Sequence, residues 1–311
     1  MSSCHLKTEA SGSNATVNKP GLLQQVRWGF GSLVRQSPSA AIGATSLALI
    51  VLACFVVPFV LGRDGEVTDL LNTFTPPIWE QGGSWVTPLG TDNLGRDVLS
   101  RILTGGRISI VVALASVTMA LIVGVMLGTI AGFYGGRLDS LIMRVGDLFL
   151  AYPFMLLTIS VIALLGPSIT NLIIILALAD WVTYARTVRG SVLSARSREY
   201  VRAAEVIGVR NSTIIIRHVL PNILAPVLVL ATVRAANYII WESGLSFLGM
   251  GVPPPTPTWG IMLAEGRNYI LNAWWLVTLP GLAIMFTILS INLLGDGLRD
   301  AMDPRLKRAG K

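Results

Sequence analysis

The chain has 311 residues, of which 52% are hydrophobic and only 13% are charged, and its formal net charge is +7. Soluble domains carry about 25% charged residues, so this chain has too few charges to cover a soluble surface. High apolar content also excludes intrinsic disorder, and a count of two cysteines excludes a disulfide scaffold. The mean hydropathy of +0.65 indicates a membrane protein.

The first predicted membrane span follows a polar tail. Residues 39–61 form an apolar run of 23 residues, which is long enough to cross a hydrocarbon core of ~30 Å. The run is long and lacks a small-residue cleavage site, so we expect an anchor and not a cleaved signal peptide. Cys54 lies in this span and Cys4 in the tail, so we expect two free thiols.

Five further spans are expected from four apolar windows. The first is the charge-free window 108–136. The window 148–179, continued to residue 185, is too long for one span and is interrupted at 166–167 by Gly-Pro, which predicts a tight hairpin of two helices. The runs 222–247 and 273–294 complete the count. The sequence therefore predicts an all-α membrane protein with six transmembrane helices.

The basic residues predict the orientation of these spans. The side that holds both termini carries 18 of the 24 Lys and Arg residues, and the opposite side carries five. The positive-inside rule therefore places both termini in the cytoplasm. The basic excess is then a topology signal, and we expect no nucleic acid partner. The expected division is a cytoplasmic tail at 1–38, a first transmembrane helix at 39–61, an extracytoplasmic segment at 62–105, a five-helix core at 106–295 with a long loop at 186–218, and a cytoplasmic tail at 296–311.

Motifs for catalysis and cofactor binding are missing from the sequence. It contains no G-x-x-x-x-G-K-[ST] phosphate loop, no H-E-x-x-H and no G-x-S-x-G elbow, and its two histidines are His5 and His218. We therefore expect no catalytic site, no metal site and no cofactor bound by this chain. A stand-alone secondary transporter stays as an alternative, although inverted repeats and a chain of buried ionisable groups are not evident. A membrane-bound enzyme is the other alternative.

The loop 186–218 has the pattern of two short helices joined by a glycine. Glu199, Ala203 and Val206 fall on one face of the first helix, and Ala203 with Ala204 offers a low-relief surface. Gly208 is expected to end this helix in the left-handed conformation. Periodicity alone leaves two readings open, a docking element for a partner or a solvated amphipathic loop.

The second short helix of this loop begins in the sequence at 214–216. We expect it to close at Leu220-Pro221, because proline blocks simple continuation of a helix. The chain would then bend before it enters the next span.

This loop resembles the EAA loop of permease subunits of ATP-binding-cassette (ABC) importers, at the positions Ala203, Ala204, Gly208, Leu220 and Pro221. The likeness extends over roughly 35–307 to the C-type permeases of dipeptide, oligopeptide and nickel importers, through the segments 90–101, 106–110, 242–249, 253–260 and 292–304. Two positions depart from the family pattern. Arg202 stands where the loop motif has Glu, and His218 stands where it has Ile before Leu-Pro.

The resemblance implies a type I ABC importer permease fold in the bacterial inner membrane. It implies a second homologous permease, two ATPase subunits that bind ATP and Mg, and an extracytoplasmic substrate-binding protein. The cargo implied is a peptide, with nickel chelates, glutathione or opine-like compounds as alternatives. The residues implied to dock the ATPase are Glu199, Ala203, Ala204, Gly208, Leu220 and Pro221.

Three further groups of residues are candidates for structural or functional roles. Gly124, Gly128 and Gly132 form a G-x-x-x-G ladder, which permits close packing either within the chain or against a partner permease. A charged cluster on the outer side, expected to act as a structural clamp or to contact substrate, consists of Asp92, Arg96, Asp97 and Arg101.

The third group consists of charges inside predicted spans, namely Asp180, Arg234 and Glu242. A charge in hydrocarbon is costly, so each must pair or meet water. Asp180 and Arg234 lie at similar predicted depths, so they either pair with each other or line the transport pathway. Glu242 lies near the outer end of its span, either in a substrate vestibule or in tight packing.

Overall fold

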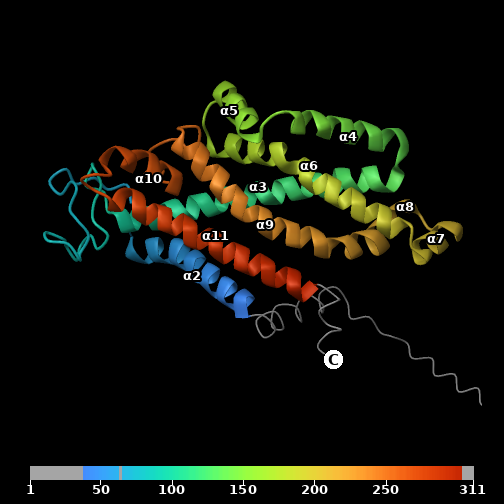
Figure 1. The fold of residues 1–311 in the computed structure, drawn as a ribbon, viewed down its shortest axis with the longest axis horizontal. Coiled ribbons are helices and arrows are strands. Elements are labelled where there is room, and N and C mark those ends of the chain that lie inside the picture. Colours follow the sequence, from blue (N-terminus) through green and yellow to red (C-terminus); the bar gives the residue numbers. More distant parts are fainter. Residues whose placement is uncertain (1–37, 63–64, 303–311) are drawn as a thin grey trace, which may run out of the picture.

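The computed structural model describes residues 38–62 and 65–302 (Figure 1). Within these ranges the regular secondary structure is helical, the segment 65–97 consists of turns and irregular backbone, and the β-structure is limited to isolated bridges. The expected terminal tails, Cys4 included, lie outside the described residues except for their innermost positions. Five helices of the described residues are long and apolar enough to cross a membrane, and a pair of shorter helices bent by 88° makes a sixth span if the two cross together. The long helices are α2 (Pro38–Leu61), α3 (Val98–Tyr134), α6 (Ile169–Arg196), α9 (Leu220–Phe247) and α11 (Trp275–Met302), and the shorter ones are α4 (Gly136–Ala151), α5 (Phe154–Leu165), α7 (Glu199–Val206), α8 (Asn211–Ile214) and α10 (Trp259–Gly266).

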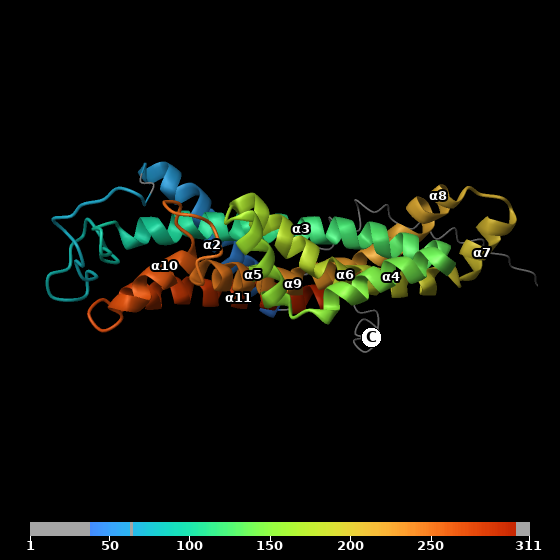
Figure 2. The ribbon, with the colours of Figure 1, turned by 90° about the horizontal axis from the view of Figure 1, so that it is seen from above.

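The described part of the molecule is elongated along the helix axes. The segment 65–97 and α10 gather at one end, and α7 and α8 lie at the other end in both views (Figures 1 and 2). We call these ends the outer and the inner end, after the orientation that the basic residues predict. Helices α2 and α11 pack against each other, and a Cβ on Gly43 would lie 2.6 Å from the backbone N of Leu294.

Helix α3 begins ten residues before the apolar window that predicted it. Asp97 caps its N-terminus, because the carboxylate accepts a hydrogen bond of 3.2 Å from the backbone N of Ser100. The first turns carry Arg101, which is ion-paired, and Arg107, whose guanidinium lies 5.5 Å from the Phe55 ring centroid. Because both charges have partners in the protein, they do not interrupt the helix.

The glycine ladder of α3 packs against α6. A Cβ on Gly124 would lie 2.3 Å from the Cβ of Tyr184, and one on Gly128 would lie 2.5 Å from the carbonyl oxygen of Ala185. A Cβ on Gly132 would lie 2.9 Å from the carbonyl oxygen of Arg189. The expectation of packing within the chain is confirmed, and the alternative of a partner permease on this face is wrong.

The predicted hairpin at 148–185 is only partly correct. Its second helix is α6, and its turn contains Gly166 at φ +83°. Its first helix is shorter than expected, because the chain breaks at Pro153 and bends by 88° between α4 and α5. Proline disfavours a helical conformation in the residue before it, and Tyr152 is extended here. At 12 residues, α5 extends ~18 Å and cannot cross the membrane alone.

The expected bend at Leu220-Pro221 is wrong. The segment from Asn211 to Phe247 runs as a single candidate span, in which a π-helical turn at Ile215–Val219 joins α8 to α9. Pro221 lies in the first turn of α9, where its missing N–H costs least. The wider π turn makes room for the ring, so the helix continues through the proline.

Candidate functional site

The inner end of the molecule carries the loop that the sequence singled out. Arg196 at the end of α6 donates to the carbonyl oxygen of Phe133 at 2.6 Å and pairs with Glu205 of α7 at 3.3 Å. These contacts fix α7 against the ends of α3 and α6. Gly208 follows α7 with φ +80°, and nothing lies within 4 Å of the position that its Cβ would occupy. The left-handed conformation predicted for Gly208 is confirmed.

The two alanines of α7 have different environments. Ala204 is buried with Val201 and Ile214 in an apolar cluster of the same chain. Ala203 is exposed, as are Val206 and Ile207, whose exposed fractions are 86% and 77%. The expectation that Ala204 belongs to the docking surface is therefore wrong, because its small side chain is needed for packing within the loop. The exposed apolar tip consists of Ala203, Val206 and Ile207, with Glu199 also exposed at the start of the helix.

The two departures from the family pattern lie beside this tip. Arg202 is exposed on α7. The ring of His218 lies 6.3 Å from that of Tyr200, and the His218 carbonyl oxygen accepts a hydrogen bond of 2.5 Å from Asn222. Leu220 packs against the apolar cluster of the loop, next to Pro221. Neither departure changes the glycine turn or the exposed apolar tip.

A polar network joins α6 and α9 in the middle of the bundle. Arg234 forms a bidentate ion pair with Asp180, with one contact of 3.0 Å between Nε and Oδ2. Arg234 also donates to Thr183 at 2.9 Å, and Tyr238 donates to Asp180 at 3.2 Å. The guanidinium lies 5.3 Å from the Trp241 ring centroid. Of the two alternatives left open by the sequence, the structure shows the pair, while 20% of the Arg234 side chain stays exposed.

Glu242 is fully buried at the outer end of α9. Its carboxylate accepts from Ser246 at 2.8 Å and from Ser243 at 3.4 Å. The neighbouring backbones are close, since a Cβ on Gly260 would lie 2.4 Å from the carbonyl oxygen of Ser243. Glu242 therefore lies where the 250–260 segment packs tightly against α9.

The outer charged cluster is a four-residue network. Arg96 contacts Asp92 at 2.6 Å and Glu265 at 2.9 Å, and Arg101 contacts the same two carboxylates. Burial of Asp92 opposes its ionisation, but the Arg96 backbone N–H and the guanidiniums of Arg101 and Arg96 hold the pKa of this carboxyl below its usual value. Asp97 lies apart as the cap of α3. The network joins the segment 65–97 to α10, which supports the clamp.

Sequence reasoning missed Glu265. It is one acidic residue in a segment rich in Pro, Gly and Trp, and no spacing links it to Arg96, which is 169 positions earlier. The predicted cluster already contained two acidic and two basic residues, so no imbalance of charge in the sequence pointed to a further acidic partner.

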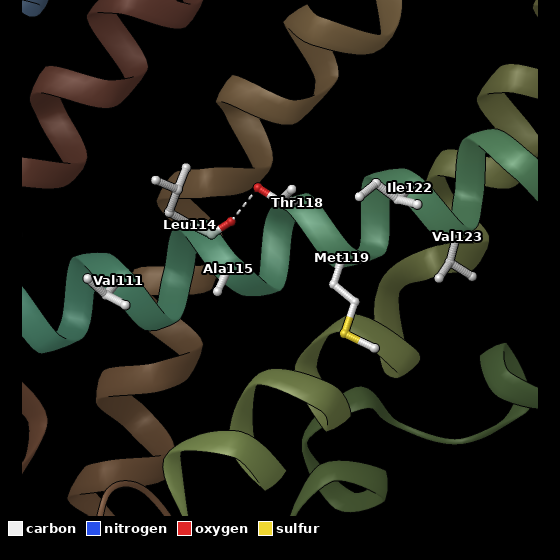
Figure 3. A pocket seen from close by; sticks show the side chains of 7 residues that line it. All are labelled: Val111, Leu114, Ala115, Thr118, Met119, Ile122 and Val123. Atoms are coloured by element: carbon white, nitrogen blue, oxygen red, sulfur yellow. Dashed lines mark hydrogen bonds between the residues drawn. The ribbon is translucent and has the colours of Figure 1, made fainter.

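A shallow apolar hollow follows the surface of α3 (Figure 3). Thr118 is its polar residue, and the hydroxyl donates to the Leu114 carbonyl oxygen at 2.7 Å. The hollow is therefore an apolar surface whose polar contribution is one hydroxyl oxygen. Its lining consists of Val111, Leu114, Ala115, Thr118, Met119, Ile122 and Val123.

The structure is a bundle of membrane-length helices. It has an exposed apolar tip on α7 at one end and the segment 65–97, which ion pairs join to α10, at the other. This architecture is that of a membrane permease. Comparison with known proteins gives the family. Residues 124–308 match the family of binding-protein-dependent transport system inner membrane components. The chain belongs to this family and is a permease subunit of an ABC importer.

Three similar proteins show how far the likeness extends. The di/tripeptide transport system permease protein of Pseudomonas aeruginosa (strain UCBPP-PA14) is 45% identical over 86% of this chain and 88% of the relative. The glutathione transport system permease protein of Pectobacterium atrosepticum is 40% identical over 88% and 89%. The MetNI methionine ABC transporter in an inward-facing conformation matches 65% of this chain and 97% of its own, with a TM-score of 0.51 at 14% identity. This structural likeness concerns the fold.

Proposed function

We propose that this permease forms half of a pore for peptides, which a substrate-binding protein delivers from outside the cell. The observation that supports the proposal is the 45% sequence identity to a di/tripeptide permease, which extends over 86% of this chain. Glutathione is itself a tripeptide, so the glutathione relative fits the same cargo class. Nickel chelates and opine-like compounds are the alternatives with the same architecture.

The importer would contain a second homologous permease and two ATPase subunits. The exposed tip Ala203, Val206 and Ile207 would enter a groove of one ATPase. Exposed apolar side chains at a tip are a hallmark of interaction sites. ATP and Mg would be bound by the ATPases, while this chain has no catalytic site and binds no cofactor. Both termini and α7 would lie in the cytoplasm, and the segment 65–97 would face the binding protein.

Transport would follow from a difference in affinity between two states of the pore. Closure of the ATPase dimer on ATP would favour the outward-facing state, and hydrolysis would release it. The loop that contains α7 and α8 would transmit the state of the ATPases to α6 and α9. Helix α7 is fixed to α6 by the Arg196–Glu205 pair and is joined to α9 through α8.

The test uses the assembled importer reconstituted in vesicles with its binding protein. ATP-dependent uptake of a labelled dipeptide is expected, and Gly208→Val should abolish co-purification of the ATPases or peptide-stimulated ATP turnover. A β-branched residue at positive φ costs at least about 1–2 kcal/mol and tilts the loop. Gly166→Val is the matched control. Gly166 also has a positive φ, +83°, and equally open space around its Cβ position, but it follows the C-terminal end of α5 and is not part of the loop that contains Gly208.

Two results would contradict the proposal. Uptake without ATPases, driven by a proton gradient, would establish a secondary transporter. Normal ATPase binding and turnover in Gly208→Val would show that this loop is not the coupling element.

A further inference from the structure

A polar cleft opens between the inner halves of α6 and α9. It is distinct from the apolar hollow on α3, since α3 packs on the other face of α6. Its volume is about 470 Å³. The cleft is lined by Arg186, Thr187, Gly190, Ser191, Ser194, Ala195, Arg198, Asn222, Ile223 and Pro226.

Hydroxyl groups form a continuous line on this face of α6. Thr183 bonds Arg234 and Asp180, and one turn further the Thr187 hydroxyl donates to the Thr183 carbonyl oxygen at 2.9 Å. Ser191 donates to the Thr187 carbonyl oxygen at 3.0 Å. The Thr187 and Ser191 hydroxyls donate their protons to helix carbonyls, so their oxygens can still accept hydrogen bonds from the cleft. The cleft ends at Arg186 and Thr187, about one turn below Thr183 and about two turns below Asp180.

Such a face does not suit lipid tails. Polar groups in hydrocarbon need partners, and at Gly190 nothing in the described chain lies within 4 Å of where a Cβ would be. The charge of the cleft is positive. Arg186 is paired with Asp147 at 2.5 Å, whereas no carboxylate of the described residues lies within ion-pair distance of Arg198. An unpaired guanidinium beside hydroxyls recognises carboxylates and phosphates.

We propose that the α6–α9 cleft is a water-filled inner vestibule that attracts anionic groups, the carboxylate of a departing peptide being the cargo group that it receives. The cargo part rests on the proposed function. The claims that the cleft holds water and that it prefers anions depend only on the residues of the cleft. They are tested by experiments that do not measure transport.

The first experiment measures access of water. The assembled importer, with Cys4 and Cys54 replaced by serine and alanine, is placed in inside-out vesicles of phosphatidylcholine. Thr187→Cys should react with charged methanethiosulfonate reagents at least about tenfold faster than Met126→Cys. Met126 is the matched control because it is exposed on α3 among apolar residues, and it lies between Gly124 and Gly128, which contact α6 at Tyr184 and Ala185, close to the depth of the cleft. Equal, slow reaction at both positions would overturn the proposal.

The second experiment measures charge selectivity at Ser194→Cys. Relative to a free thiol, the anionic sulfonatoethyl reagent should be favoured over the cationic trimethylammonium reagent by about threefold or more, as expected for one charge several ångströms away. Arg198→Gln should remove most of this preference. Arg202→Gln is the control, since Arg202 is exposed on α7 and does not line the cleft. A preference that Arg198→Gln leaves unchanged would overturn the selectivity.

A lipid headgroup is the competing occupant, and a third arm decides it. If vesicles with anionic phosphatidylglycerol suppress the reaction at Thr187→Cys, the cleft is a lipid site and the vestibule is overturned. Unchanged reaction supports water. An importer that fails to move dipeptides but labels as expected would refute the proposed function and leave the vestibule in place.

Discussion

Removal of one charge from the Asp180–Arg234 pair should strongly destabilise the permease. Arg234→Leu leaves the Asp180 carboxylate, whose side chain is 3% exposed, with the hydroxyls of Thr183 and Tyr238 as its donors. Breaking a buried pair on one side typically costs about 3–5 kcal/mol. Protonating an ordinary carboxyl at pH 7 costs about 4 kcal/mol. Because the unpaired Asp180 carboxylate can become neutral in this way, protonation limits the loss of folding free energy.

The double variant, Asp180→Leu with Arg234→Leu, separates structure from transport. With both charges gone, Thr183 can donate to the carbonyl oxygen four residues earlier in α6, so the remaining penalty is the unpaired hydroxyl of Tyr238, about 1–3 kcal/mol. Additive effects would give about 6–10 kcal/mol, so a coupling of at least about 3 kcal/mol is expected. If the pair serves structure alone, the double variant regains uptake together with stability. If it contributes to the pathway, stability returns and uptake does not.

The assay follows folded permease by size exclusion after heating in detergent, alongside dipeptide uptake in vesicles. Ile240→Ala on α9 is the control, because Ile240 is 46% exposed and apolar. We expect its effect to be small. The reasoning would be refuted by wild-type melting and wild-type uptake in both Arg234→Leu and Asp180→Leu.

Three further predictions concern the outer clamp, the docking tip and the orientation. The pKa of the Asp92 carboxyl is lower in the folded protein than in the unfolded chain. Its contribution to stability is therefore present above the unfolded pKa of ~3.9 and is lost as the pH falls through the folded pKa. The melting temperature of the wild type should decline below about pH 4, whereas Asp92→Asn should have a lower melting temperature at neutral pH and a smaller decline. Ala203→Trp should weaken ATPase co-purification while the permease keeps its melting temperature, whereas Ala204→Trp should lower that temperature by overpacking worth about 1–3 kcal/mol; the same melting temperature in both would contradict the assigned burial. A cysteine at Gln81 should react with an impermeant maleimide in intact cells, and protection there with labelling at the C-terminus would reverse the orientation.

Five of the six spans and the glycine turn could be predicted from the sequence, because length and left-handed backbone are local properties. The span predicted at 39–61 corresponds to α2, and Gly208 has the predicted conformation. The bend at Pro153 was missed, since the apolar window runs through it without a charge. The bend predicted at Pro221 does not occur, since a π turn accommodates the ring.

The candidate sites depended on contacts that sequence patterns do not encode. Periodicity placed Ala203 and Ala204 together, yet one is exposed and the other is buried, because adjacent residues of a helix lie 100° apart and α7 has one face on the core. The choice of partners within a charged cluster is likewise tertiary. Arg101 pairs with Glu265, on a helix that joins the cluster from far along the chain.

Helix α3 has 37 residues and so is about 55 Å long, nearly twice the thickness of the hydrocarbon core. It begins beside the outer ion network and ends where Arg196 holds the carbonyl oxygen of Phe133 next to α7 (Figure 1). One continuous helix therefore connects the outer end of the molecule to the inner end that carries α7. For a rod of this length, a rocking of about 10° displaces one end by about 10 Å relative to the other. In the proposed importer, leverage along this helix would link the two sides without a relay of side chains.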